Sequence, residues 1–126
     1  MFKARVLIVD DQLEIRESLW FTLKDKYAVA TAGAAEEAFK YMDEHYFNLV
    51  LLDFKMPRID GITALKEIMK RHPGTEVIMM TGYAPADTKQ RAVNLGAFAF
   101  FMKPFDIDTF VCTIDEAVQK SITTRS

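Results

Sequence analysis

The chain has 126 residues, 50% of them hydrophobic, and a formal net charge of −2 at pH 7. These values are typical of one domain with a full core and exclude the basic surface of a nucleic-acid-binding domain. No apolar run approaches the roughly 18 residues of a membrane span, and no secretory signal opens the chain, so a cytoplasmic location is expected. Cys112 is the single cysteine, so no internal disulfide can form. We expect Cys112 to be a small core residue.

Apolar runs and helical stripes alternate through the first half of the chain. Residues 6–9 form a continuous apolar run, which predicts a buried strand, and residues 27–31 form a weaker run of the same kind. After each run, apolar residues recur with the spacing of a helix face: Ile15, Leu19 and Leu23, then Ala35, Ala38 and Met42.

The second half repeats this alternation three times. Apolar runs at 49–52, 77–80 and 98–102 predict three more strands. Two strong helical stripes follow the first and last of these runs: Ile62, Leu65 and Met69, then Ile107, Phe110, Ile114 and Val118. The segment 86–95 is the weakest predicted helix, with Val93 and Leu95 as its expected anchors and Gly96 as its C-terminal cap.

Five strand–helix units in sequence predict a (βα)5 α/β fold with a doubly wound parallel sheet. We expect the domain to extend over residues 1–121. Residues 122–126 are mostly polar and are expected to form a tail or the start of a linker. The turn signal Asp60-Gly61 precedes the third helix, and its glycine is expected to supply a backbone angle that other residues avoid.

Polar residues follow four of the predicted strands. They are Asp10-Asp11, Asp53, Thr81 and Lys103. Because function gathers at the carboxyl ends of the strands in an open parallel sheet, these side chains are expected at one edge. Three neighbouring carboxylates repel one another unless a cation binds, and hard oxygen ligands favour Mg²⁺. Phosphoryl transfer needs such a metal site, a carboxylate nucleophile and a fixed positive charge.

The set Asp10-Asp11, Asp53 to Gly61, Thr81-Gly82 and Lys103-Pro104 resembles the receiver domain of two-component response regulators. The resemblance covers essentially the whole chain. It implies a flavodoxin-like five-stranded sheet with strand order 2-1-3-4-5. It also implies a phosphoacceptor signalling domain that turns over no substrate and changes conformation on phosphorylation.

Residue by residue, the resemblance makes Asp53 the phosphoacceptor, which takes a phosphoryl group from a phosphohistidine. Asp10, Asp11 and Asp53 would ligate Mg²⁺ together with the main-chain carbonyl of Lys55. Lys103 would pair with the phosphoryl group. No further cofactor is implied.

Other positions of the family concern switching, lifetime and partners. Thr81 and the aromatic Phe100 would form the switch. Lys55 and Tyr83 occupy the two positions that tune the lifetime of the acyl phosphate, and neither side chain suits the orientation of an attacking water. We therefore expect slow self-dephosphorylation. Gln12 and Ile15 would contact the phosphodonor.

The expected partner is a sensor histidine kinase or a histidine phosphotransfer protein, with no nucleic acid or membrane bound by this chain. A homodimer through the fourth helix, fifth strand and fifth helix is possible on phosphorylation. The chain resembles stand-alone phosphorelay receivers of the sporulation type, and equally N-terminal regulatory domains of larger transcriptional regulators.

Three other readings compete with a working receiver. A flavodoxin-type module would need a phosphate-binding loop where Asp10-Asp11-Gln12 stands, and acidic residues there repel phosphate. A phosphatase with an aspartyl intermediate usually has two aspartates one residue apart, whereas Asp53 is followed by Phe54 and Lys55. A degenerate receiver would lack phosphorylation residues that this chain retains.

Overall fold

Five parallel strands form one sheet in the order β2-β1-β3-β4-β5, which confirms the predicted topology. The computed structural model describes residues 3–125. The strands are β1 (Arg5–Val9), β2 (Ala28–Ala32), β3 (Leu49–Asp53), β4 (Glu76–Thr81) and β5 (Ala99–Met102). The strand order reverses between β1 and β3, and such a switch point is where open α/β sheets place their functional crevice.

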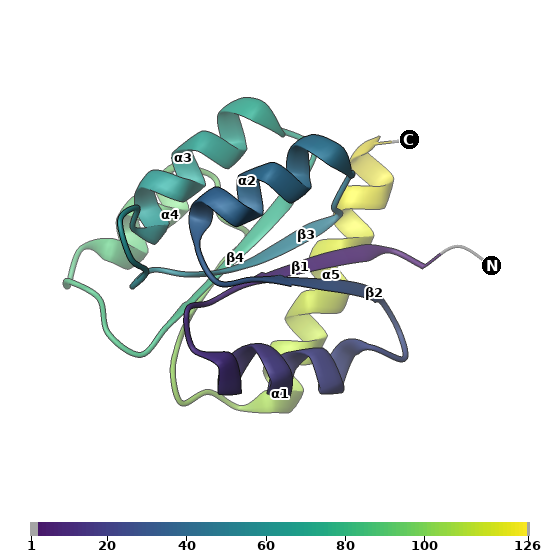
Figure 1. The fold of residues 1–126 in the computed structure, drawn as a ribbon, viewed down its shortest axis with the longest axis horizontal. Helices are drawn as coiled ribbons and strands as arrows, with labels where there is room; N and C mark the ends of the chain where they lie inside the picture. Colours follow the sequence, from purple (N-terminus) through teal and green to yellow (C-terminus); the bar gives the residue numbers. More distant parts are fainter. Residues whose placement is uncertain (1–2, 126) are drawn as a thin grey trace.

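Helices cover both faces of this sheet. They are α1 (Leu13–Leu23), α2 (Ala35–Glu44), α3 (Gly61–Arg71), α4 (Thr88–Asn94) and α5 (Ile107–Arg125). Figure 1 shows α1 and α5 on one face, and α2 and α3, with α4 beyond them, on the other. Within the described residues, no helix combines the length and the apolar character needed to cross a bilayer.

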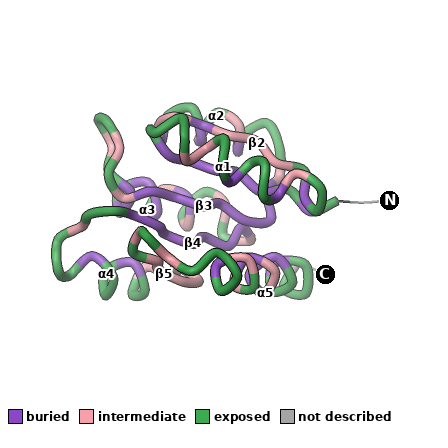
Figure 2. Tube along the Cα trace, turned by 90° about the horizontal axis from the view of Figure 1, so that it is seen from below, coloured by how far each residue is buried: buried purple, intermediate pink, exposed green. Residues whose placement is uncertain are grey.

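The sheet separates two apolar clusters. In β3, Val50 and Leu52 join the cluster under α2 and α3, whereas Leu49 and Leu51 join the cluster under α1 and α5. This division follows from the alternation of side chains along a strand. Figure 2 shows β3 and β4 buried along their length. A strand buried on both faces needs a continuous apolar run, which explains why these runs predicted strands.

One of the two predicted anchors of α4 packs as expected, since Leu95 is partly buried against the apolar core, but the other does not. Val93 is 50% exposed, and the buried residues of this helix are Thr88 and Ala92. Successive helical residues are turned by about 100°, so packing Ala92 against the sheet turns Val93 toward solvent. The expected cap is confirmed, because Gly96 has a φ of +100° and follows the last turn of α4.

The last helix also departs from expectation in two ways. Cys112 is exposed on α5 and is not a core residue. The buried stripe of α5 includes Phe110 and Ile114, and Cys112 lies midway between them on the opposite side of the helix. Residues 122–125, expected as a tail, form the final turn of α5, because no glycine or proline between 107 and 125 ends the helix.

Candidate functional site

The polar residues at the four strand ends meet at one edge of the sheet, as predicted. Strands β1 and β3 pair in parallel register, and an aspartate directly follows the last paired residue of each strand. These two aspartates, Asp10 and Asp53, are therefore neighbours. Thr81 is the last residue of β4, and its carbonyl accepts a hydrogen bond from the main-chain N–H of Lys103 at 2.7 Å. The sheet itself therefore fixes the spacing of these residues.

Lys103 supplies the positive charge of the site. Its ammonium nitrogen lies 2.8 Å from Oδ2 of Asp10 and 3.5 Å from Oδ2 of Asp53. Asp10 is fully buried, and its second oxygen, Oδ1, accepts a hydrogen bond from the main-chain N–H of Gln12 at 2.9 Å. A buried carboxylate needs such partners to offset the loss of water. Lys103 is thus already engaged with the carboxylates.

Asp10, Asp11 and Asp53 form an acidic cluster in which one carboxylate oxygen from each residue lies within 4.8 Å of the others. Asp10 and Asp53 are buried, whereas Asp11 is exposed. Three converging hard oxygen donors suit Mg²⁺, which uses few protein ligands and retains several waters. The donor set therefore fits the cation that the sequence predicts.

The electrostatics of Asp53 agree with a site that attracts positive charge. Burial raises the pKa of the Asp53 carboxyl, and the charge of Asp10 raises it further, while Lys103 acts in the opposite direction. The ionised form of Asp53 is therefore disfavoured by its surroundings. A cation bound here would lower the free energy of that ionised form.

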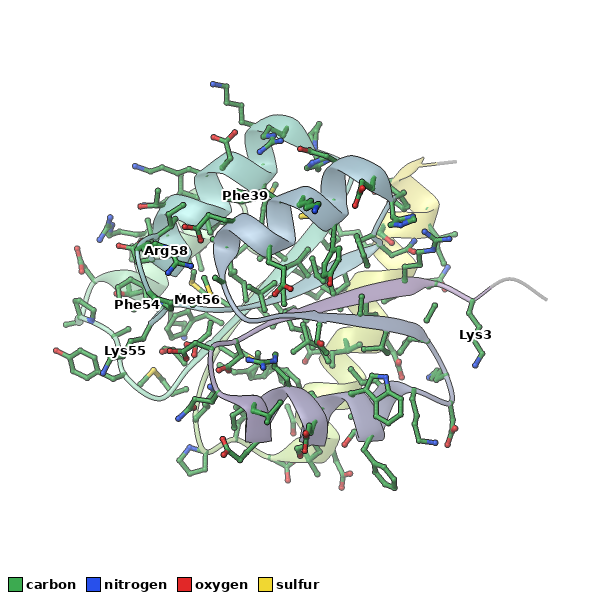
Figure 3. The ribbon with its side chains drawn as sticks, in the orientation of Figure 1. Lys3, Phe39, Phe54, Lys55, Met56 and Arg58 are labelled. Carbon is green, nitrogen blue, oxygen red and sulfur yellow. The ribbon has the colours of Figure 1, made fainter. Side chains whose placement is uncertain are left out.

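The loop after Asp53 is held close to the end of β3. The main-chain N–H of Lys55 donates to Oδ1 of Asp53 at 3.2 Å, and Gly61 N–H donates to the Phe54 carbonyl at 2.7 Å. A Cβ on Gly61 would lie 2.6 Å from the Asp53 carbonyl oxygen. Gly61 is therefore required by close backbone approach, not by an unusual φ as predicted. Figure 3 shows Phe54 and Lys55 at the opposite end of the sheet from Lys3.

Thr81 is fully buried and its hydroxyl already has a partner. Its Oγ1 donates to the main-chain carbonyl of Tyr83 at 2.8 Å. The main-chain N–H of Tyr83 approaches the same Oγ1 at 3.3 Å. Any new hydrogen bond from Thr81 to a group on Asp53 must therefore replace the bond to the β4–α4 loop, which couples this loop to the site.

A cavity of about 310 Å³ opens over the site. It is lined by Asp11, Gln12, Asp53, Lys55, Thr81, Gly82, Tyr83 and Lys103. The predicted nucleophile, positive charge, hydroxyl and both tuning positions thus share one cavity. Gly82 leaves this wall open, because a Cβ added there would meet only the Lys103 side chain, at 4.0 Å.

Three of the predicted functional residues do not line this cavity: the fully buried Asp10, Phe100 and Ile15. Phe100 is half-buried on β5 and lines a separate hollow with Lys89 and Met102. Ile15 lines an apolar groove of about 400 Å³ between α1 and the β5–α5 loop, to which Pro104 and Phe105 also contribute. The Lys103-Pro104 peptide bond in that loop is cis.

Two arginines near the site were not predicted from the sequence. Arg16 donates to the main-chain carbonyl of Asp10 at 2.7 Å. Arg58, which has a φ of +67°, pairs with Glu36 of α2 at 2.7 Å. Both arginines tie site loops to neighbouring elements. Neither lies at a strand end, and no sequence spacing indicates the bond of Arg16 to a main-chain carbonyl or the pairing of Arg58 with Glu36.

Comparisons with known proteins agree with this geometry. The model of the response regulator receiver domain family matches residues 6–115. Sporulation initiation phosphotransferase F of Bacillus subtilis (strain 168) is 38% identical over 127 residues, covering 100% of this chain and 99% of that protein. A CheY-like response regulator receiver domain protein from Methanospirillum hungatei JF-1 superposes with a TM-score of 0.92 at 33% identity, covering 98% of this chain and 99% of that chain.

Other relatives are longer. The transcriptional regulatory protein ZraR of Escherichia coli (strain K12) is 35% identical over 114 residues, which cover 90% of this chain and 26% of that protein. The chain therefore spans about a quarter of that regulator's length.

Proposed function

Because this chain belongs to the response regulator receiver domain family, we propose that Asp53 is the residue that accepts its phosphoryl group. The observation that carries the proposal is the position of Asp53, which shares a cavity with Lys103 and lies within 4.8 Å of two other carboxylates, measured between ligand oxygens. Receivers act in two-component signalling, and the phosphodonor proposed here is a phosphohistidine of a sensor kinase or phosphotransfer protein.

The proposed reaction moves a phosphoryl group from nitrogen to oxygen. A carboxylate oxygen of Asp53 attacks phosphorus, the P–N bond of the donor breaks, and the electron pair returns to the imidazole, which takes a proton from solvent. Lys103 lies 3.5 Å from Asp53 and offsets the charge of the transferred group. The buried surroundings of Asp53 strengthen this interaction, because little water screens it.

Mg²⁺ is the proposed cofactor. When bound, it supplies positive charge to the phosphoryl oxygens during transfer. Asp10, Asp11 and Asp53 would hold it through their carboxylates, together with the main-chain carbonyl of Lys55. Two of these carboxylates are buried and the third is exposed, so the exposed side of the site stays open to water and to the phosphodonor.

The conformational switch is proposed to begin at Thr81. Phosphorylation adds strong acceptor oxygens to Asp53, and the Thr81 hydroxyl would leave the Tyr83 carbonyl to bind one of them. The β4–α4 loop would then lose one of its bonds to the site. The half-buried ring of Phe100 lies in the hollow under this loop, so its packing would change with the loop position.

The phosphodonor is proposed to dock on the groove between α1 and the β5–α5 loop. Ile15 lines this groove together with Pro104 and Ile107, and its exposed lining is mainly apolar. Gln12 is exposed at the rim of the neighbouring phosphorylation cavity. An apolar groove beside the acceptor suits the helices that carry a phosphohistidine, since helix-in-groove contacts use such surfaces.

Two roles within two-component signalling are supported by different relatives. Full-length similarity to a sporulation initiation phosphotransferase favours a phosphorelay intermediate that passes its phosphoryl group to a second histidine. Similarity to one part of a transcriptional regulator favours a regulatory domain. We favour the relay, acting in the cytoplasm without catalytic turnover. On phosphorylation we expect dimerisation through α4, β5 and α5, where Val93 and Met102 are 50% and 48% exposed.

The test is transfer from a phosphorylated histidine phosphotransfer protein in the presence of Mg²⁺. We expect the chain to gain an acid-stable, hydroxylamine-sensitive phosphoryl group, and the Asp53→Asn variant to gain none. Asp25→Asn, on a residue far from the site in the α1–β2 turn, is the matched control and should be phosphorylated normally. Phosphorylation of Asp53→Asn at the parent rate would contradict the assignment. Onward transfer to a second histidine protein separates the relay from a terminal regulatory domain.

A further inference from the structure

Helix α1 has a second apolar stripe besides the one that packs on the sheet. Leu19 and Leu23 of the first stripe are buried. Leu13, Trp20 and Phe21 are 53%, 44% and 70% exposed. The outer face of a surface helix is normally polar. A neighbouring pair of exposed aromatic residues therefore marks this face of α1 as a candidate contact surface.

Opposite charges stand on either side of the aromatic pair. Glu17 lies three and four residues before Trp20 and Phe21, and Lys24 lies four and three residues after them. Residues with these spacings share one face of a helix. The Lys24 ammonium lies 5.8 Å and 5.4 Å from the ring centroids of Trp20 and Phe21. The face therefore has an acid at one end, two aromatic rings in the middle and a base at the other end.

We propose that this face is a homodimer interface in which α1 packs antiparallel against α1 of a second copy. A two-fold axis through the midpoint of the aromatic pair would place residues opposite each other when their numbers add up to 41. Trp20 would then face Phe21 of the second copy, and Glu17 would face Lys24. Each contact would occur twice, as a two-fold interface requires.

The shape and charge of the surface favour a second copy over another partner. A hollow of about 290 Å³ beside Trp20, lined by Leu13 and Thr31 among others, offers space for an aromatic ring. A partner of single charge would suit only one end of the face, whereas a reversed copy suits both. The present partner of Lys24 is Asp25, whose side chain is 91% exposed, and such pairs exchange at little cost.

This interface lies on a different side of α1 from the groove that contains Ile15. It is therefore separate from the proposed phosphodonor site and does not depend on phosphorylation of Asp53. Trp20 is the single tryptophan of the chain, so its fluorescence reports on this face alone.

The test exploits the symmetry of the charge pairs. In Glu17→Lys, both pairs become lysine–lysine, and in Lys24→Glu both become glutamate–glutamate. Like charges in contact oppose association. The dissociation constant of each variant's dimer should therefore be at least about tenfold higher than that of the parent dimer. Mixing the two variants restores opposite charges at both contacts, so the mixture should form a heterodimer. Glu44→Lys and Lys40→Glu on α2 are the matched controls.

Sedimentation of the unphosphorylated chain over a concentration series measures the association, and the Trp20 emission should move to shorter wavelength as the dimer forms. Circular dichroism of each variant checks the fold. A chain that stays monomeric throughout the series would overturn the proposal and assign the face to a different partner. A dimer that tolerates both charge reversals, or two variants that fail to associate with each other, would overturn it as well.

Discussion

The ammonium nitrogen of Lys103 lies 2.8 Å from Oδ2 of Asp10, a carboxylate with no exposed surface. Lys103→Met removes this partner and leaves a buried charge uncompensated. Breaking a buried pair in this way costs about 3 kcal/mol, so the free energy of unfolding should fall by roughly that amount in chelator-treated buffer. Urea unfolding measures the change. In the Asp10→Asn background the same substitution should cost much less, whereas an equal cost in both backgrounds would show that the pair is not the cause.

Stability should depend on pH through Asp53. Its pKa is raised in the folded protein by burial and by Asp10, so the folded state keeps the proton to higher pH than the unfolded chain. The free energy of unfolding therefore falls as the pH rises from about 4, the unfolded pKa, through the folded pKa. In Asp53→Asn the free energy of unfolding does not fall in this way. The variant should therefore be more stable than the parent at pH 7, but not at or below pH 4. A constant difference across this range would contradict the assignment.

Mg²⁺ should stabilise the fold through the acidic cluster. A ligand present at 100 times its dissociation constant adds about 2.7 kcal/mol to the free energy of unfolding. Thermal unfolding with and without Mg²⁺ measures this gain. Asp11 offers one of the three converging carboxylates and is exposed, so Asp11→Asn should fold normally and lose most of the gain. Asp25→Asn should keep it, and an unchanged Mg²⁺ response in Asp11→Asn would place the ion elsewhere.

The strands and the acidic edge could be predicted from the sequence for one physical reason. Parallel strands that are buried on both faces need continuous apolar runs, and their carboxyl ends share an edge. That is why Asp10, Asp53 and Lys103 could be grouped before any distance was known. Which of the two carboxylates lies nearer to the Lys103 ammonium could not be predicted, since this depends on the conformation of the Lys103 side chain.

The errors have an equally physical origin. Gly61 looked like a turn residue, but the reason for a glycine is the Asp53 carbonyl 2.6 Å from where a Cβ would stand. Val93 looked like an anchor because it is large and apolar, yet the small Ala92 faces the sheet. The Arg58–Glu36 pair joins residues 22 positions apart. Close approach, helix rotation and distant pairing are tertiary properties that local patterns do not record.

Helix α4 should open more readily than α3. It has seven residues and two buried side chains, whereas α3 has eleven residues and five buried ones. The buried hydroxyl of Thr88 has no hydrogen-bond partner among the described residues, which destabilises the helix in this position. Hydrogen exchange should therefore be faster across residues 88–94 than across 61–71. Equal protection of the two helices would contradict this prediction.

Thr88→Val tests the physical cause. Valine has nearly the same shape as threonine and removes the unpaired hydroxyl, so it should raise the stability of α4 by about 1 kcal/mol and slow its exchange. If the β4–α4 loop moves on phosphorylation, the same variant should also respond less to the phosphodonor. Thr63→Val, on the exposed side of α3, is the matched control. Faster exchange in Thr88→Val would show that the hydroxyl is satisfied in solution.

The acyl phosphate proposed to form on Asp53 should be long-lived because of the side chains that surround it. Lys55 and Tyr83 line the cavity over the acceptor, and neither has a carboxylate or amide to orient an attacking water. Lys55→Asn introduces an amide at this position and should shorten the lifetime, which is measured by following the decay of the phosphorylated chain after removal of the donor. Lys66→Asn, on the exposed side of α3, should decay like the parent. A lifetime of seconds in the parent chain would contradict slow self-dephosphorylation, and would mean that a group other than these two side chains positions the water.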